Sequence, residues 1–301
     1  MKKSILIACL GLVSLGLQAQ SISLAGEWNV ELGKSGSAFA KSKHASQGEV
    51  KCAILPGTID TNHLGFAPKD TMETTHLTRL YAYKGAARYS RTINIPKDWK
   101  KKPVELFLER TRPTWVYVDG ELVDSCNFIS TPQRYLLPKK VKPGKHLLEI
   151  VVDNGRGVPD QVYGSSHAYT EDTQTNWNGI IGRIELQLAC SVESKSAETL
   201  TEAIPSSSVV PSAGAISSHS VASPTVLQMP DFAKDFHIEG AHFYANGHRI
   251  FLRGKHDAAV WPLTGHVEMS VEGWMKYLGT CKEYGINHVR FHSWCPPEAA
   301  F

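Results

Sequence analysis

The chain has 301 residues, a formal net charge of +3, and 20% charged residues. Its lysines and arginines are spread out, and the densest group, Lys97–Lys102, also holds Asp98 and Trp99. Such an interleaved group is more typical of a solvated corner than of a nucleic-acid surface, so we expect no nucleic-acid partner. Beyond residue 20 no apolar run approaches the length of a membrane-spanning helix, and we expect no membrane span.

The first residues resemble an export signal. Met1 opens a short basic start, Ile5–Leu17 is apolar, and Ala19 offers a small residue for cleavage. Cys9 lies in a segment similar to a lipoprotein cleavage box, but it is too near the start to leave an apolar region before it. We therefore expect residues 1–19 to be a signal peptide and the protein to be exported, periplasmic or extracellular, in preference to lipid-anchored.

The cysteines show no metal-ligand spacing. After removal of the signal they are odd in number and widely scattered, at Cys52, Cys126, Cys190, Cys281 and Cys295. This pattern favours buried free thiols, with a single disulfide as the alternative in an oxidising compartment. We predict no metal site.

Residues 21–190 have the pattern of an all-β domain. Short runs of β-branched and aromatic residues recur between turn signals, most clearly at Ala87–Ile95, Val104–Leu108, Trp115–Val118, Leu147–Val152 and Ile181–Leu188. Asp119-Gly120 predicts a tight hairpin turn. The stretch predicts one β-sandwich of the jelly-roll type.

Residues 191–230 differ in composition from the rest. Between Pro205 and Pro230 there are eight serines, four prolines and no Asp, Glu, Lys or Arg. Such a segment cannot bury enough apolar surface to offset the entropy of ordering it. It is predicted to be a flexible linker.

The last segment predicts a strand, loop, helix and strand. Asn246-Gly247 favours a hairpin between His242–Ala245 and Arg249–Leu252. A polar loop is expected after Gly254. Ser270 is predicted to cap a helix that ends near Gly285, and a second strand is predicted at 286–291.

A strand, helix and parallel strand form the repeat of a (β/α)₈ barrel, whose active site lies at the carboxyl ends of the strands. A complete barrel takes about 250 residues, whereas Gly254–Phe301 supplies 48. We therefore expect the first βαβ unit of an incomplete barrel. Its apolar helix residues Trp274, Met275 and Leu278 are expected to remain unburied.

Several ordered motifs resemble glycoside hydrolase family 2, which includes β-galactosidases, β-mannosidases and β-glucuronidases. Segments similar to its galactose-binding-like jelly roll are 24–30 (LAGEWNV), 55–60 (LPGTID), 89–96 (YSRTINIP) and 176–186 (NWNGIIGRIEL). Segments similar to the start of its barrel are 251–257 (FLRGKHD), 262–265 (PLTG) and 289–296 (VRFHSWCP). The resemblance implies retaining hydrolysis of terminal β-glycosidic bonds in a glycan or oligosaccharide, without a cofactor.

The chain departs from the family pattern in two ways. The serine-rich linker stands where members carry an immunoglobulin-like domain, and Phe232–Glu239 resembles only the last strand of that domain. The family's acid/base and nucleophile glutamates lie on later barrel strands and are absent.

Retaining hydrolysis needs two carboxyl groups about 5–5.5 Å apart. Glu268, Glu272 and Glu283 are expected beside or on an outward-facing helix, and Glu298 is expected to cap a helix. We assign no catalytic residue, and we expect the chain alone to be inactive.

Six residues are predicted to contact substrate: Arg290, His292, His256, Asp257, Trp294 and Asn176. The resemblance implies that Arg290 borders the nucleophile and holds it ionised. His292 is expected on the same face as Arg290, although the family order Ser-His is reversed here.

His256 and Asp257 are expected to reach sugar hydroxyls from the loop, or only to cap it. Trp294, like Trp261, offers a ring face for a sugar, with core packing as the alternative. Asn176 is expected at the cleft rim or in a polar turn that orients Trp177. His167 receives no assigned partner.

Two other interpretations remain open. The sandwich alone could be a non-catalytic carbohydrate-binding module with a disordered tail. The chain could also be an inactive gene fragment.

Overall fold

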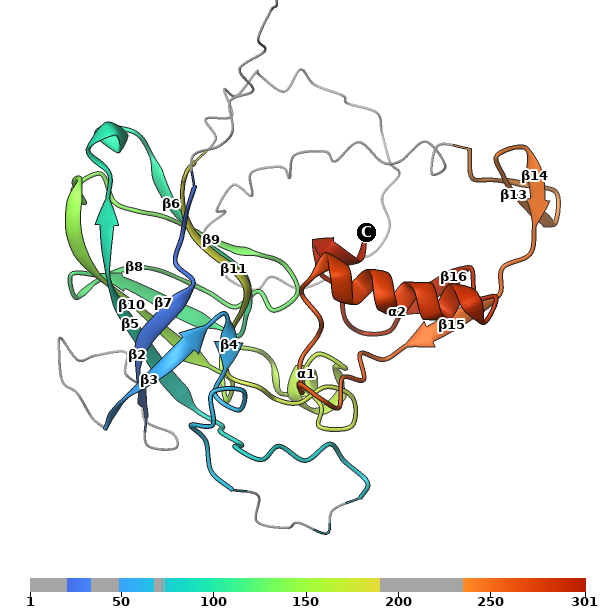
Figure 1. Ribbon diagram of the computed structural model, residues 1–301, viewed down its shortest axis with the longest axis horizontal. Helices are drawn as coiled ribbons and strands as arrows, with labels where there is room; N and C mark the ends of the chain where they lie inside the picture. Colours follow the sequence, from blue (N-terminus) through green and yellow to red (C-terminus); the bar gives the residue numbers. More distant parts are fainter. Residues whose placement is uncertain (1–20, 34–48, 68–71, 73, 190–234) are drawn as a thin grey trace, which may run out of the picture.

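The computed structural model describes residues 21–33, 49–67, 72, 74–189 and 235–301 (Figure 1). The predicted signal (1–19), the whole of the predicted linker (191–230) and Cys190 lie outside these residues. Among the helices described, none is long and apolar enough to cross a membrane. The cysteines that are described are free thiols: Cys52, Cys126, Cys281 and Cys295. The expectation that they are buried is wrong, because Cys52 and Cys295 are exposed and Cys126 and Cys281 are only partly buried.

Within the described residues, one antiparallel sheet has five strands. Along it lie β1 (Ser21–Ser23), β11 (Gly179–Leu188), β6 (Val104–Thr111) and β9 (Gln133–Leu136) in that order, and β4 (Gly57–Thr58) also pairs with β11. A bulge in β11 separates Ile181 from Ile184 in the pairing with β6.

The second antiparallel sheet has six strands in the described part of the chain. Their order is β3 (Val50–Leu55), β2 (Gly26–Leu32), β5 (Ala86–Ile95), β10 (Gly144–Asp153), β7 (Thr114–Val118) and β8 (Glu121–Cys126). The five strands predicted from the sequence are confirmed as the central parts of β5, β6, β7, β10 and β11. The predicted hairpin turn is confirmed too, since Asp119 and Gly120 both have positive φ, at 51° and 76°.

The two sheets enclose one apolar core, which confirms the β-sandwich. Its members come from both sheets and include Trp28, Tyr89, Leu106, Leu148, Ile150 and Ile184, each at most 2% exposed. Each large apolar side chain buried this way stabilises the fold by about 1.5–3 kcal/mol. The core holds the two sheets together, and the loops at the sheet ends form a separate surface that contacts the C-terminal part of the chain.

That surface is the segment 166–178, which follows the short helix α1 (Asp160–Ser165). Arg112 of the sandwich is hydrogen-bonded to this segment. The Arg112 guanidinium is 1% exposed and donates to the carbonyl oxygens of Ala168 at 2.7 Å, Thr175 at 3.0 Å and Trp177 at 3.1 Å. Its carbon lies 4.0 Å from the ring centroids of both Tyr169 and Trp177. One buried side chain therefore sets the shape of the segment.

The C-terminal part contains two smaller sheets. A three-stranded antiparallel sheet joins β12 (His237–Glu239), β13 (His242–Ala245) and β14 (His248–Ile250) in the residues described. The predicted hairpin is confirmed, because Asn246 and Gly247 have φ of 52° and 71°. A separate parallel pair joins β15 (Gly254–Asp257) and β16 (His288–Phe291), connected through helix α2 (Val271–Glu283).

The prediction of a polar loop at Lys255–Asp257 is wrong. These residues form β15, paired in parallel with β16 from Gly254–His288 to Asp257–Phe291. The polar side chains of Lys255, His256 and Asp257 show no strand pattern in the sequence. The hydrogen bonds between strands join main-chain groups, however, and do not depend on side-chain polarity. Consequently the first strand of the βαβ unit is β15 and not Arg249–Leu252.

Helix α2 begins and ends as the sequence indicates. Ser270 Oγ accepts the Gly273 N–H at 3.0 Å, which is an N-cap. At the other end the N–H of Gly285 bonds to Lys282 O at 2.8 Å, and that of Ile286 bonds to Cys281 O at 3.0 Å. This pair of bonds is a Schellman motif, and Gly285 takes its positive φ of 75° without strain.

The expectation that Trp274 remains unburied is wrong. Trp274 is 1% exposed and belongs to a junction cluster, an apolar cluster made jointly by the sandwich and the C-terminal unit: Ala168, Trp177, Ile181, Ala259, Val267, Trp274 and Trp294. Met275 is 69% exposed, as expected. The helix therefore turns its indole toward the sandwich, and Figure 1 shows the β15–α2–β16 unit beside it.

Replacing Arg112 by methionine is predicted to destabilise the fold by at least about 3 kcal/mol. Three buried carbonyl oxygens lose their donor, and each unsatisfied group costs about 1–3 kcal/mol. Urea unfolding followed by tryptophan fluorescence measures the effect. Arg134→Met is the control, since Arg134 is half-exposed in an ion pair with Glu105 and should cost less than about 1 kcal/mol. Equal, small losses in both variants would contradict the prediction.

Candidate functional site

The carboxyl ends of β15 and β16 bring two predicted site residues together. His256 lies directly opposite Arg290 in the parallel register, so their side chains share one face of the pair. Arg290 Nη1 lies 3.2 Å from His256 Nε2. Both residues are exposed on this face.

His292 joins them from the residue after the strand. Its N–H donates to Asp257 O at 2.9 Å, which holds the turn against the end of β15. The His292 ring centroid lies 4.6 Å from that of His256. The sequence placed His292 on the same face as Arg290, which this geometry is consistent with, and placed His256 in a loop, whereas it lies on β15 beside Arg290.

A third histidine comes from the sandwich. His167 Nδ1 lies 3.0 Å from His292 Nδ1, and the two ring centroids are 4.5 Å apart. We call His167, His256 and His292 the histidine cluster. No local pattern pairs His167 with His256 or His292, because these partners are more than 80 residues away in the chain.

Hydrogen bonds to main-chain oxygens hold the sandwich, which carries His167, against the C-terminal unit, which carries His256 and His292. Ser166 Oγ donates to Ser293 O at 3.0 Å, and Arg110 Nη1 donates to Cys295 O at 2.7 Å. On the far side Thr175 donates through both its N–H and Oγ to Gly265 O, at 3.1 and 2.8 Å. The sandwich segment 166–178 thus positions the turn that carries His292.

Asp257 does not belong to this surface. Alternation along β15 turns it away from His256, and it is 3% exposed. Its Oδ2 accepts from Lys255 Nζ at 3.2 Å and bonds to the Tyr277 hydroxyl of α2, while Oδ1 accepts the Ala259 N–H at 2.8 Å. Of the two alternatives for Asp257 the structure supports capping of the loop and not a sugar contact, and Asp257 also links β15 to α2.

Trp294 is also placed inside the protein. It is 8% exposed, its indole N–H donates to Asp257 O at 3.0 Å, and its ring lies edge-on to Phe291. Little of either ring face is open to a sugar. Of the two alternatives for this residue the structure supports packing. Trp261 packs likewise against Trp274, with centroids 5.5 Å apart.

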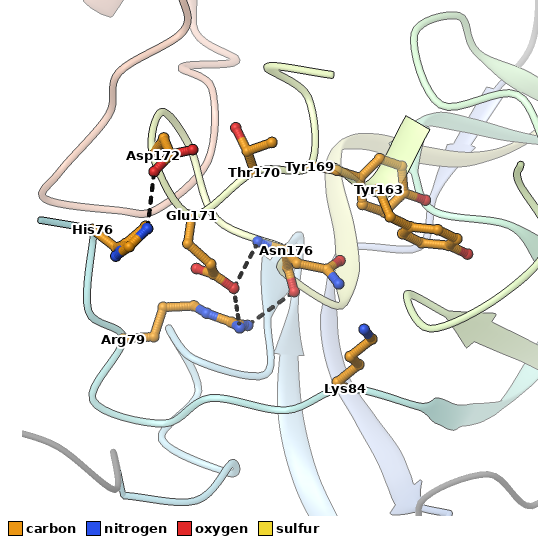
Figure 2. A pocket seen from close by; sticks show the side chains of 9 residues that line it. All are labelled: His76, Arg79, Lys84, Tyr163, Tyr169, Thr170, Glu171, Asp172 and Asn176. Atoms are coloured by element: carbon orange, nitrogen blue, oxygen red, sulfur yellow. Dashed lines mark hydrogen bonds and ion pairs between the residues drawn. The ribbon is translucent and has the colours of Figure 1, made fainter. Parts of the chain in front are cut away.

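Asn176 lies apart from the histidine cluster. It is 8% exposed. Its side-chain Nδ2 donates to Asn154 O at 2.9 Å, and Asn154 Nδ2 donates to Asn176 O at 2.6 Å. It lines a separate pocket of the sandwich (Figure 2). Trp177, which it was expected to orient, packs in the junction cluster and not in the sandwich core.

The carboxylates of the C-terminal unit have other partners. Glu268 Oε1 accepts the N–H groups of Met269 and Ser270 at 2.8 and 2.7 Å, just before α2. Glu298 lies 3.5 Å from Arg183 of the sandwich, and Glu272 and Glu283 are exposed. In the part of the chain that the structure describes, no carboxylate bonds to Arg290 or the histidine cluster. The same residues contain no group of three or more ligands placed for a metal ion.

The surface is therefore rich in hydrogen-bond donors and carries the cationic Arg290. An arginine and three imidazoles can donate to the hydroxyl, ring or carboxylate oxygens of a ligand. The arrangement can bind an oxygen-rich molecule.

Two histidines at the junction have a lowered pKa. Burial lowers the pKa of His167, and the neighbouring His292 and His256 lower it further, against the opposite effect of Asp172 and Asp257. Burial also lowers the pKa of His266, whose ring lies edge-on to Trp177. In both cases the fold favours the neutral imidazole.

Acid is predicted to weaken the protein through these groups. A histidine whose folded pKa is depressed is protonated more readily in the unfolded state, so stability is present above about pH 6.5 and falls as the pH drops below it. Urea midpoints measured from pH 8 to 5 should show a shallower acid loss in His167→Gln than in the parent chain.

The comparison with a variant is needed because the pKa of His146 is shifted in the opposite direction, so its effect on stability in acid is opposite. Burial opposes the shift there, but hydrogen bonds to Asp119 and to Lys142 O raise the pKa of His146, which stabilises the fold at low pH. His248→Gln is the control, because His248 is an exposed histidine on β14, away from the cluster. An acid slope unchanged by His167→Gln would contradict the prediction.

No protein-family model and no curated protein matches the sequence. Solved structures similar to part of it include a glycoside hydrolase family 2 (GH2) beta-galacturonidase from Eisenbergiella tayi, at 21% identity over 56% of this chain and 24% of that chain, with a TM-score of 0.39. A Faecalibacterium prausnitzii beta-glucuronidase matches at 17% identity, over 57% of this chain and 32% of that chain, with a TM-score of 0.41.

A Bifidobacterium dentium beta-glucuronidase, complexed with coumarin-3-O-glucuronide, matches at 18% identity over 57% of this chain and 30% of that chain, with a TM-score of 0.42. The chain thus spans between about a quarter and a third of the length of these structures. Likeness at these identities and TM-scores does not by itself establish an activity.

Proposed function

We propose that the chain belongs to the family 2 glycoside hydrolases and that Arg290 and the histidine cluster form its sugar-binding surface. The observation that carries the proposal is their convergence. Arg290 and His256 face each other on parallel strands, and His292 and His167 close the group from two separate segments. Such a group at the carboxyl ends of parallel strands is where a barrel of this kind builds its site.

The family resemblance gains support from where its motifs lie. The segments 251–257 and 289–296 are adjacent in space through β15 and β16. The segment 176–186 supplies Trp177 and Ile181 to the junction cluster. We infer that the sandwich is a galactose-binding-like jelly roll and that β15, α2 and β16 are the first βαβ unit of a barrel.

The chemistry assigns binding to this surface. The Arg290 guanidinium is always charged and donates in a fixed planar geometry, which suits a carboxylate or a pair of sugar oxygens. In the family this arginine borders the nucleophile glutamate. His256, held 3.2 Å from Arg290, offers its second ring nitrogen to a ligand hydroxyl.

Hydrolysis by the 301-residue chain alone is not expected. Retention needs an acid/base and a nucleophile about 5–5.5 Å apart. Asp257, the neighbour of His256 in the sequence, faces α2 and is bonded to Lys255 and Tyr277. The basic and apolar start at residues 1–19 suggests export, so a glycan outside the cytoplasm is the proposed partner.

Binding is predicted to depend on Arg290. Loss of hydrogen bonds to a charged donor costs about 1.5–3 kcal/mol, so Arg290→Ala should weaken binding of a sugar ligand at least about tenfold. Titration of the purified chain with methyl β-glycosides of glucose, galactose, mannose and glucuronic acid, followed by NMR, measures the loss. The same glycosides should not be cleaved.

Arg249→Ala is the matched control, because Arg249 is an exposed arginine on β14. It should leave affinity unchanged. Equal affinity in Arg290→Ala and the parent chain would contradict the site. Release of methanol from any of the glycosides would contradict the expected inactivity.

A further inference from the structure

A pocket of about 310 Å³ opens on the sandwich, separate from the histidine cluster. Figure 2 shows the side chains that line it: His76, Arg79, Lys84, Tyr163, Tyr169, Thr170, Glu171, Asp172 and Asn176. All come from the sandwich and its loops. None of them is needed for the binding surface proposed above.

One wall of the pocket is fixed by ion pairs. Arg79 donates to Glu171 Oε1 at 2.7 Å and to Asn176 O at 2.9 Å, and His76 Nε2 lies 3.2 Å from Asp172 Oδ1. These contacts hold the wall in place and offset most of its charge. A simple anion is disfavoured here, because it would face two carboxylates.

Two acceptor oxygens in this pocket have no partner. Asn176 Oδ1 and Glu171 Oε2 are both buried without a hydrogen bond. Asn176 as a whole is only 8% exposed. Figure 2 shows the Asn176 carboxamide pointing away from the Arg79–Glu171 pair, toward the tyrosine side of the pocket. Buried acceptors rarely stay unsatisfied, and each costs about 1–3 kcal/mol. They call for a ligand that donates hydrogen bonds.

The opposite side is aromatic. Tyr163 lies edge-on to Tyr169, with ring centroids 4.9 Å apart. Lys84 Nζ lies 5.9 Å from the Tyr163 centroid and is exposed, so it can donate to a ligand oxygen. An apolar ring beside acceptors and one cationic donor matches a molecule that has both C–H faces and hydroxyl groups.

We propose that this pocket binds a small neutral polyhydroxylated ligand, such as a monosaccharide unit. Hydroxyl groups of the ligand donate to Asn176 Oδ1 and Glu171 Oε2, and its C–H face packs on Tyr163. Lys84 donates to a ring or hydroxyl oxygen. The proposal rests on the pocket alone and does not depend on the glycosidase assignment.

The test is a titration of the chain with glucose, galactose and mannose, followed by saturation-transfer NMR. It is made in an Arg290→Ala background, in which binding at the histidine cluster is expected to be weakened at least about tenfold. At least one sugar should bind there. Tyr163→Ala and Glu171→Gln should each weaken that binding at least about tenfold.

Tyr284→Ala is the matched control, because Tyr284 is 82% exposed at the end of α2, and it should bind as the background does. Urea midpoints show which variants are folded. Absence of sugar binding in the Arg290→Ala background would overturn the proposal, as would full affinity in a folded Tyr163→Ala and a folded Glu171→Gln. Either result leaves the role of the histidine cluster open to its own test.

Discussion

The buried guanidinium of Arg112 is the interaction on which the functional part of the molecule depends. It is enclosed by Tyr169 and Trp177 and bonded to three carbonyl oxygens of the segment 166–178. A charge in such a place is stable only if its donors are satisfied, so the loop has to follow the guanidinium. The segment that meets the C-terminal unit is thereby set by a residue of the sandwich.

The segment 166–178 makes three sets of contacts, on different faces of the loop. Trp177 packs in the junction cluster with Trp274 and Trp294, and His167 meets His292. On another face Glu171 and Asn176 line the sandwich pocket. Gly182 shows how close the junction is, because a Cβ there would lie 2.6 Å from the Met269 side chain. One loop thus positions both candidate binding surfaces.

Local signals in the sequence predicted the strands of the sandwich, both hairpin turns and the caps of α2, because periodicity, Asn-Gly and Ser N-caps act over a few residues. The strand β15 was missed, since Lys255, His256 and Asp257 are polar and only the pairing with β16 makes them a strand. Arg290 and His292 could be grouped from their places at the end of the predicted second strand. The opposite orientation of Asp257, the burial of Trp274 and the meeting of His167 with His292 depend on long-range packing, which no local pattern encodes.

The central claim is that the sandwich loop and the β15–α2–β16 unit form one cooperative structure. Hydrogen–deuterium exchange on the whole chain, read at single amides, tests it most directly. The account predicts that the amides of Thr175, of α2 and of His292 are protected and open together with the sandwich. Rapid exchange throughout α2 and β16 while the sandwich strands stay protected would contradict it.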